Sequence, residues 1–227
     1  MHLGFTLETL RGPRPLSVEL DRLVIAGWAG RDPTVVEHHV AELAAIGVPR
    51  PSAVPLFYRV AGNQLLQDES VQVVGPASAG EIEPFVFAAA GELYVTVASD
   101  HTDRALERQS VALAKQLCAK PVARTAWLLA EVEEHWDELE LRATIVEGDR
   151  EVLYQADGVA SLRTPRDLIA RLTANGSLPD GTGMACGTVG VIGSIRPAAA
   201  FIMELVDPRL GRSIRHRYDV AVLDEVR

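Results

Sequence analysis

Cysteine and aromatic residues are scarce in this chain. The 227 residues include two cysteines, Cys118 and Cys186, and aromatic side chains make up only 5% of the sequence. Two cysteines so far apart argue against a disulfide-rich scaffold and against a cysteine-based zinc knuckle. The two thiols are compatible with a reducing compartment, and we expect both to be buried.

The chain also lacks a basic leader and a long apolar run. Residues 1–4 do not begin the basic region and apolar stretch that a signal peptide needs. The longest uncharged stretch near the C-terminus, 181–195, has 15 residues, of which five are glycine. It is too short and too rich in glycine for a membrane helix, so we predict a cytoplasmic protein without a membrane partner.

Basic residues are fewer than acidic residues. Lys and Arg total 22 and Asp and Glu total 31, which leaves a formal net charge of −9. A nucleic-acid or anionic-membrane partner needs a basic surface, so this balance disfavours both. It still permits a small anionic organic substrate, because a site can be locally positive. Hydrophobic residues at 48% indicate a globular protein, and the length suits a single domain with a sizeable core.

Turn-forming residues divide the chain into many short strand candidates and three helix candidates. The strands are expected at 5–10, 16–20, 23–26, 56–60, 71–74, 82–88, 93–98, 136–146, 152–155, 187–192, 200–206 and 213–223, and the one at 136–146 is expected to have a helical lead-in. The helices are expected from Pro33 to about residue 46, from about 104 to 117 and roughly from 165 to 174. Strands and helices do not alternate strictly, so the pattern predicts an α+β or β-rich mixed fold.

Some residues are expected to be structural. We interpret Trp28, Trp127 and Trp136 as aromatic residues of the core or of an interface. The acidic run 131–140 is interpreted as a solvated face.

Glu81 and Glu83 stand two residues apart at the start of an apolar strand. The period of a strand puts both carboxylates on one face, roughly 6–7 Å apart. Like charges so placed repel unless something neutralises them, and a divalent cation with its preference for oxygen ligands does so well. The pair therefore indicates a metal site, with the solvated edge of an exposed strand as the alternative.

Asp100 follows the strand 93–98 at the expected entry to a helix, and Arg104 comes four residues later. An Asp at a strand end can join a metal site, and the guanidinium could bind a carboxylate through two hydrogen bonds. The alternative is a helix-capping sequence with an arginine paired on the surface.

His39 and Glu42 lie three residues apart on the first predicted helix, which starts next to Asp32. Residues at this spacing share a helix face. A Glu hydrogen-bonded to a His ring fixes the tautomer and raises the basicity, as a general base requires. In the alternative, Asp32 caps the helix and the other two form a solvated pair.

Taken in order, these segments resemble the fumarylacetoacetate hydrolase superfamily, and within it a bacterial branch. The segments that carry the resemblance are Asp32, His39-x-x-Glu42, residues 55–59, Glu81-x-Glu83, Asp100-x-x-x-Arg104, Lys115 and Gly187-Thr188. The resemblance implies a β-rich α+β fold, a mixed β-sandwich roll, that is commonly a homodimer. It also implies N-terminal strands at 1–26 packed on a single catalytic domain at 27–227.

The resemblance further implies a role for each residue. A Mg²⁺ or Mn²⁺ ion would be held by carboxylates only, namely Asp32, Glu81, Glu83 and Asp100. His39 would activate water, and Glu42 would orient it. Substrate oxygens would be held by Arg104, Lys115, Gly187 and Thr188. Lys120 competes with Lys115 as the lysine of the site.

The activity that the resemblance implies is a metal-dependent hydrolase. It would cleave a small acylpyruvate-like or oxo-acid substrate through a metal-stabilised enolate. The alternative is a metal-dependent lyase, a decarboxylase or dehydratase of a small oxo-acid or sugar acid, because the same enolate serves both reactions. A non-catalytic ligand-binding protein and an unrelated β-rich domain with surface carboxylates are further alternatives.

Overall fold

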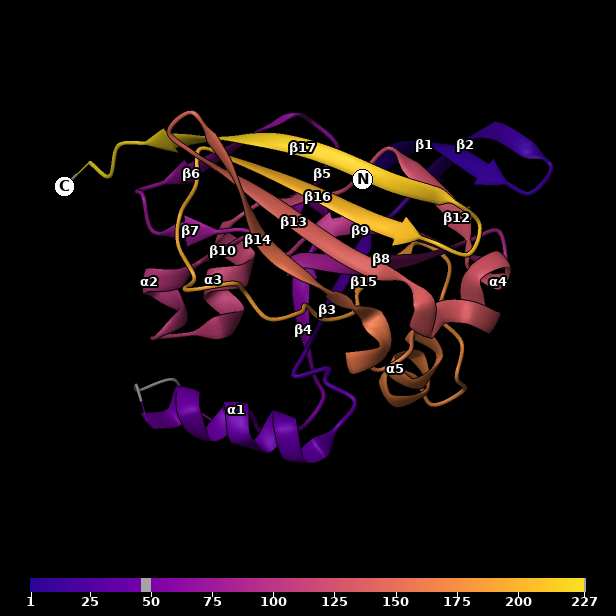
Figure 1. Cartoon of the computed structure of the whole chain (residues 1–227). Helices are drawn as coiled ribbons and strands as arrows, with labels where there is room; N and C mark the ends of the chain where they lie inside the picture. The colour runs from indigo at the N-terminus through magenta and orange to yellow at the C-terminus, as the bar shows by residue number, and fades with distance from the viewer. Residues whose placement is uncertain (46–49, 227) are drawn as a thin grey trace.

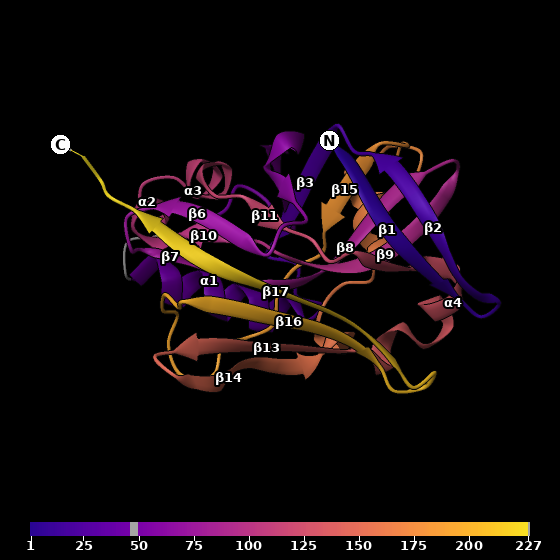
Figure 2. The ribbon, with the colours of Figure 1, turned by 90° about the horizontal axis from the view of Figure 1, so that it is seen from above.

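Two β-sheets lie one over the other and share an apolar core (Figures 1 and 2). The computed structural model describes residues 1–45 and 50–226, without the side chains of residues 39, 42, 43 and 45. Most of the secondary structure is strand, with a few short helices. The prediction of a β-rich α+β fold is confirmed.

The larger sheet has eight strands. Their order is β2 (Gly12–Glu19), β1 (His2–Thr9), β12 (Thr125–Leu128), β9 (Glu92–Ser99), β8 (Ile82–Ala89), β15 (Thr182–Ala185), β3 (Arg22–Gly27) and β4 (Leu56–Ala61). Strand β8 is central and is buried from Ile82 to Ala88. A strand covered on both faces needs a continuous apolar run, which explains why this segment does not alternate.

The smaller sheet has five strands. Their order is β14 (Arg150–Gly158), β13 (Glu140–Glu147), β16 (Ala200–Asp207), β17 (Arg212–Leu223) and β6 (Ser70–Val74). Strand β13 buries Leu141, Ala143 and Ile145 at alternate positions, as a strand with one covered face does. Two short pairs complete the strands, β10 (Thr102–Asp103) with β7 (Ser78–Ala79) and β11 (Lys120–Pro121) with β5 (Leu65–Leu66).

The helices lie around the edges of the sheets (Figure 1). They are α1 (Pro33–Ala45), α2 (Arg104–Glu107), α3 (Val111–Leu117), α4 (Leu129–Val132) and α5 (Pro165–Leu172). Three 3₁₀ turns cover Gly62–Gln64, Glu133–Glu138 and Val159–Ser161. Helix α1 follows strand β3 and stands apart from the sheets, which leaves its N-terminal turn facing the site described below. Among the described helices, none has both the length and the apolar character needed to cross a membrane.

The apolar core has two parts. The part between the sheets includes Trp127, Trp136 and both cysteines, all of which are buried as predicted. The part on the other face of the larger sheet includes a stack of Phe5, Phe87 and Tyr94, with adjacent ring centroids 4.7 and 5.2 Å apart.

Two predicted elements are wrong. The helix expected over 104–117 is two helices, because the Ser110 side chain accepts a hydrogen bond from the Leu113 N–H and so starts a new one. The strand expected over 187–192 is an irregular segment with one isolated bridge, between Gln155 and Val191. Its first residue, Gly187, has a φ of +96°, which a strand does not accommodate.

The acidic run 131–140 is not simply a solvated face. It contains the buried residues His135 and Trp136. His135 Nε2 lies 3.0 Å from the carboxylate of Asp207, and Arg212 bridges Asp207 and Glu131 at 3.2 Å each. Charged residues in this run therefore attach the 3₁₀ turn to the smaller sheet.

Candidate active site

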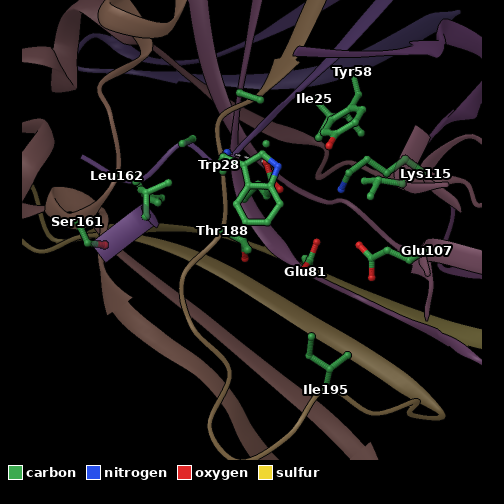
Figure 3. Close-up of a pocket in the computed structure, with 18 of the residues that line it drawn as sticks. Ile25, Trp28, Tyr58, Glu81, Glu107, Lys115, Ser161, Leu162, Thr188 and Ile195 are labelled. Carbon is green, nitrogen blue, oxygen red and sulfur yellow. Dashed lines mark hydrogen bonds between the residues drawn. The ribbon is translucent and has the colours of Figure 1, made fainter. Parts of the chain in front are cut away.

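A cavity of about 360 Å³ opens at one end of the strands of the larger sheet. Segments far apart in the sequence line it: the end of β3, the start of α1, the start of β8, helices α2 and α3, and the segment around Gly187. Figure 3 shows Glu81, Glu107 and Lys115 along one side of this cavity. It therefore combines several of the side chains singled out in the sequence.

Three carboxylates converge at this edge. Glu81, Glu83 and Asp100 each present an oxygen atom, and these three atoms lie within 4.8 Å of one another. The antiparallel register of β8 and β9 pairs Glu83 with Ala98, and the Asp100 N–H donates to the Glu81 carbonyl at 2.9 Å. The pairing of the two strands thus brings Asp100 beside the two glutamates.

In the segment from Asp100 to Arg104, the residue that caps the helix is not Asp100 but Asp103. Asp103 accepts a hydrogen bond from the Leu106 N–H at 2.8 Å and so caps α2. Asp100 is free of that role and is completely buried.

Cationic side chains surround the carboxylates. Lys115 donates to one oxygen of Asp100, and Lys120 Nζ lies 3.1 Å from the other. Arg104 lies 3.1 Å from Glu81 and 3.0 Å from Glu107. Lys115 lines the cavity. Lys120 does not line it, and its ammonium group also donates to the His101 carbonyl. Both candidates for the lysine of the site therefore contact the same carboxylate, that of Asp100.

The pKa values of the two buried acids of the cluster are shifted in opposite directions. Burial alone would raise the pKa of Asp100, but the charges of Lys115 and Lys120 outweigh it and hold that pKa below its ordinary value. Burial and the nearby charge of Asp100 raise the pKa of Glu83 well above its ordinary value. The cluster therefore holds a carboxylate whose negative charge lacks sufficient compensation.

A divalent cation fits this arrangement. The donor set consists of carboxylate oxygens only, as Mg²⁺ and Mn²⁺ prefer. A cation there would compensate the charge of Glu83, one of whose oxygens already accepts the Gly187 N–H at 2.7 Å. Glu81, Glu83 and Asp100 are therefore the residues of the structure that could hold the metal.

The segment around Gly187 is tied to the cluster through a buried glutamine of the smaller sheet. The Gln155 side chain accepts from the Ile82 N–H at 3.1 Å, and it donates to Thr188 Oγ1 at 2.8 Å and to the Val189 carbonyl at 2.6 Å. Thr188 in turn donates to the Ile82 carbonyl at 2.7 Å. Ile82 stands between the two glutamates, so Gln155 couples their strand to the segment that closes the cavity.

Asp32, the fourth metal ligand that the resemblance implies, is not brought into the carboxylate cluster. Asp32 is exposed and accepts a hydrogen bond from the Thr34 N–H at 2.8 Å, which is a cap at the start of the helix. His39 and Glu42 belong to α1, but their side chains lie outside the described part of the structure.

His101 lies behind the cluster. Its ring nitrogens lie 3.0 Å from the Tyr218 hydroxyl and 2.9 Å from the Ser78 hydroxyl. Burial and the charge of Lys120 lower the pKa of His101 to about 3, so the ring is neutral. It supports the loop that carries Asp100.

Sequence reasoning missed three residues of the site. Glu107 lines the cavity, and its spacing of three from Arg104 on a helix could have revealed it. Trp28 was expected in the core or an interface, but it is half-buried in the cavity wall with a φ of +58°. Gln155 carried no sequence signal, because its partners lie far away along the chain.

The family of the chain follows from its sequence. Residues 26–218 match the model of a family described as "Protein of unknown function (DUF2848)". The chain belongs to this family. A search of the curated proteins finds no match.

Solved structures share the fold. A hexagonal crystal form of 2-keto-3-deoxyarabinonate dehydratase is 15% identical with a TM-score of 0.66, covering 91% of this chain and 76% of that one. Cg1458 with inhibitor is 18% identical with a TM-score of 0.64, and the match covers 95% of this chain and 82% of that one. 2-Keto-3-deoxy-D-arabinonate dehydratase complexed with magnesium and 2,5-dioxopentanoate is 17% identical with a TM-score of 0.62, covering 95% and 78%. The chain therefore shares the β-rich fold of these structures, which agrees with the fold that the resemblance implied.

Glu83→Gln tests the proposed metal ligands. We expect the affinity for Mg²⁺ and Mn²⁺ to fall more than about tenfold, because outer-shell changes alone cost about 10–100-fold. The metal-free variant should unfold at no lower temperature than the wild type, because the amide removes a buried charge. Calorimetric titration and thermal unfolding measure both. Glu107→Gln, in the same cavity but outside the cluster, should keep the affinity, and equal affinities for both variants would contradict the assignment.

Gln155→Leu tests the coupling between the smaller sheet and the cluster. The variant leaves the Ile82 N–H without its acceptor, so we expect a loss of about 1–3 kcal/mol in the free energy of unfolding. Metal affinity should fall by about 10–100-fold, as for other outer-shell changes. Leu141→Ala, which removes a buried side chain of β13, should destabilise the fold yet keep the affinity. An unchanged affinity in folded Gln155→Leu would show that the glutamine does not position the ligands.

Proposed function

We propose that this protein is a divalent-metal-dependent lyase that acts on a small 2-oxo-acid. The observation that carries the proposal is the convergence of Glu81, Glu83 and Asp100 beside Arg104 and Lys115 at the edge of a cavity. The resemblance of the sequence alone put a hydrolase first. Two similar solved structures are named as dehydratases, and one contains magnesium, so the comparisons favour the lyase.

The metal would be held by Glu81, Glu83 and Asp100. When bound, Mg²⁺ or Mn²⁺ would supply electrostatic stabilisation of the negative charge that develops on the substrate oxygens. The three carboxylates of the cluster suffice for this proposal, and Asp32 as a fourth ligand stays a prediction from the sequence.

The cations and the threonine would bind and orient the substrate. Arg104 and Lys115 line the cavity and offer N–H donors to the substrate carboxylate. Thr188 Oγ1 already donates to Ile82 and accepts from Gln155, which leaves one lone pair for a substrate hydroxyl. Gly187 lacks a Cβ, which would lie 2.7 Å from that of Ala29, and so lets the backbone reach Glu83.

His39, oriented by Glu42, is proposed as the base. It would take the proton from the carbon next to the keto group, and in a dehydration it would return that proton to the hydroxyl of the following carbon, which would leave as water. In the hydrolase alternative the same base would activate a water molecule. Cytoplasmic localisation and a homodimer also stay predictions.

Product analysis separates the two reactions. The metal-loaded protein is incubated with a panel of 2-oxo-acids, including 3-deoxy sugar acids and acylpyruvates, and the products are identified by mass spectrometry. A lyase yields products whose masses add up to that of the substrate, with water or carbon dioxide as one of them. A hydrolase yields two fragments that together contain one added water, and that result would overturn the lyase proposal.

His39→Ala tests the proposed base. We expect the variant to bind Mg²⁺ as the wild type does and to lose turnover by about 10²–10⁴-fold, the usual contribution of general acid–base catalysis. His38→Ala is the matched control, because this exposed neighbour on α1 is assigned no role in the reaction. Steady-state kinetics on the best substrate of the panel measures both. Comparable turnover in the two variants would remove His39 from the mechanism.

A further inference from the structure

The cavity has two unlike sides. The charged cluster occupies one side, and apolar side chains form much of the rest. The apolar wall, as we call it, consists of Ile25, Trp28, Val35, Val36, Leu162 and Ile195. In Figure 3, Leu162 lies on the side of the view opposite Glu107 and Lys115, and Trp28 lies between them. Ile195 lies below Glu81, and Ile25 lies beside Tyr58 above Lys115. A bound molecule would therefore contact charge at the cluster and hydrocarbon over much of the remaining lining.

The hydroxyl groups near the apolar wall already donate to the protein. Thr188 donates to the Ile82 carbonyl at 2.7 Å, and Ser161 donates to the Gly158 carbonyl at 3.1 Å. These two hydroxyls can therefore only accept further hydrogen bonds, and the only polar side-chain atom of the apolar wall itself is the indole nitrogen of Trp28. A polyhydroxylated tail would lose most of its hydrogen bonds to water on binding here. Burying a polar group without a partner is unfavourable, so the wall disfavours such a tail.

Two side chains of the apolar wall face water when the cavity holds no ligand. Val35 on α1 is 66% exposed, and Ile195 in the segment before β16 is 48% exposed. They belong to different segments that meet at the same cavity. Covering apolar surface of this kind is favourable, and the gain grows with the hydrocarbon area that a ligand brings.

We infer that the substrate is a 2-oxo-acid with a hydrocarbon tail rather than a polyhydroxylated sugar acid. The carboxylate and keto oxygens would bind at the charged cluster, and the tail would lie along the apolar wall. The placement of the carboxylate and keto oxygens at the charged cluster rests on the proposed function. The hydrocarbon character of the tail rests on the residues of the apolar wall. The substrate class thus differs from the sugar acids in the names of the dehydratase structures.

A series of saturated 2-oxo-acids tests the inference, because such acids carry no leaving group and report binding alone. Calorimetric titration with and without Mg²⁺ compares pyruvate, 2-oxobutanoate, 2-oxopentanoate and 2-oxohexanoate with 2-keto-3-deoxyarabinonate. We expect the affinity to rise about fourfold for each added methylene, which corresponds to about 0.8 kcal/mol, and the sugar acid to bind more weakly than 2-oxopentanoate.

Each outcome separates the inference from the proposed function. Metal-dependent binding of pyruvate with no gain along the series, or tighter binding of the sugar acid, overturns the hydrocarbon tail and leaves the metal site intact. A gain along the series that does not depend on Mg²⁺ supports the tail and contradicts the metal-bound head. No binding by any of these acids overturns both.

Substitutions in the apolar wall supply the matched control. The double variant Val35→Thr/Ile195→Thr should flatten the dependence of affinity on tail length. Ile192→Thr is the control, because Ile192 belongs to the same segment as Ile195, has the same 48% exposure and does not line the cavity. All three positions are exposed, so the variants are expected to fold. An unchanged dependence on tail length in the double variant overturns the inference.

Discussion

The electrostatic balance of the buried carboxylates is the constraint on which the site depends. A fully buried Asp100 is unfavourable unless it is paired, and Lys115 and Lys120 pair with its two oxygens. These lysines come from α3 and β11, so the charge of one aspartate holds both elements against the end of β9. Glu83 is less well compensated, and this imbalance makes the cluster suited to a divalent cation.

The packing of the two sheets is part of the same site. The larger sheet carries the glutamates on or beside β8, whereas Gln155 comes from β14 of the smaller sheet. Its side chain bonds the Ile82 backbone and the segment after Gly187 together. Relative movement of the sheets would therefore disturb the spacing of the ligands, which links the stability of the fold to the chemistry of the cavity.

The charged cluster and the apolar wall of the cavity would have different roles in the proposed function. The charged side would bind the oxygen-rich head of the proposed 2-oxo-acid substrate. The apolar wall is built from α1, the end of β3 and two loop segments, none of which supplies a carboxylate of the cluster. In the proposed function, substrate selection and chemistry would therefore depend on different parts of the fold.

Local pattern in the sequence was enough for most strands, for the start of α1 at Pro33 and for the common face of Glu81 and Glu83, whereas the place of Asp100 beside them was implied by the family resemblance. These features depend on backbone period, capping and the order of neighbouring strands, which act over a few residues or across one hairpin. The tertiary structure alone decided that Asp32 caps its helix outside the cluster, that 187–192 is not a strand, and that Gln155 reaches Ile82. Those outcomes depend on sheet packing and on contacts between segments many residues apart, for which a local pattern carries no information.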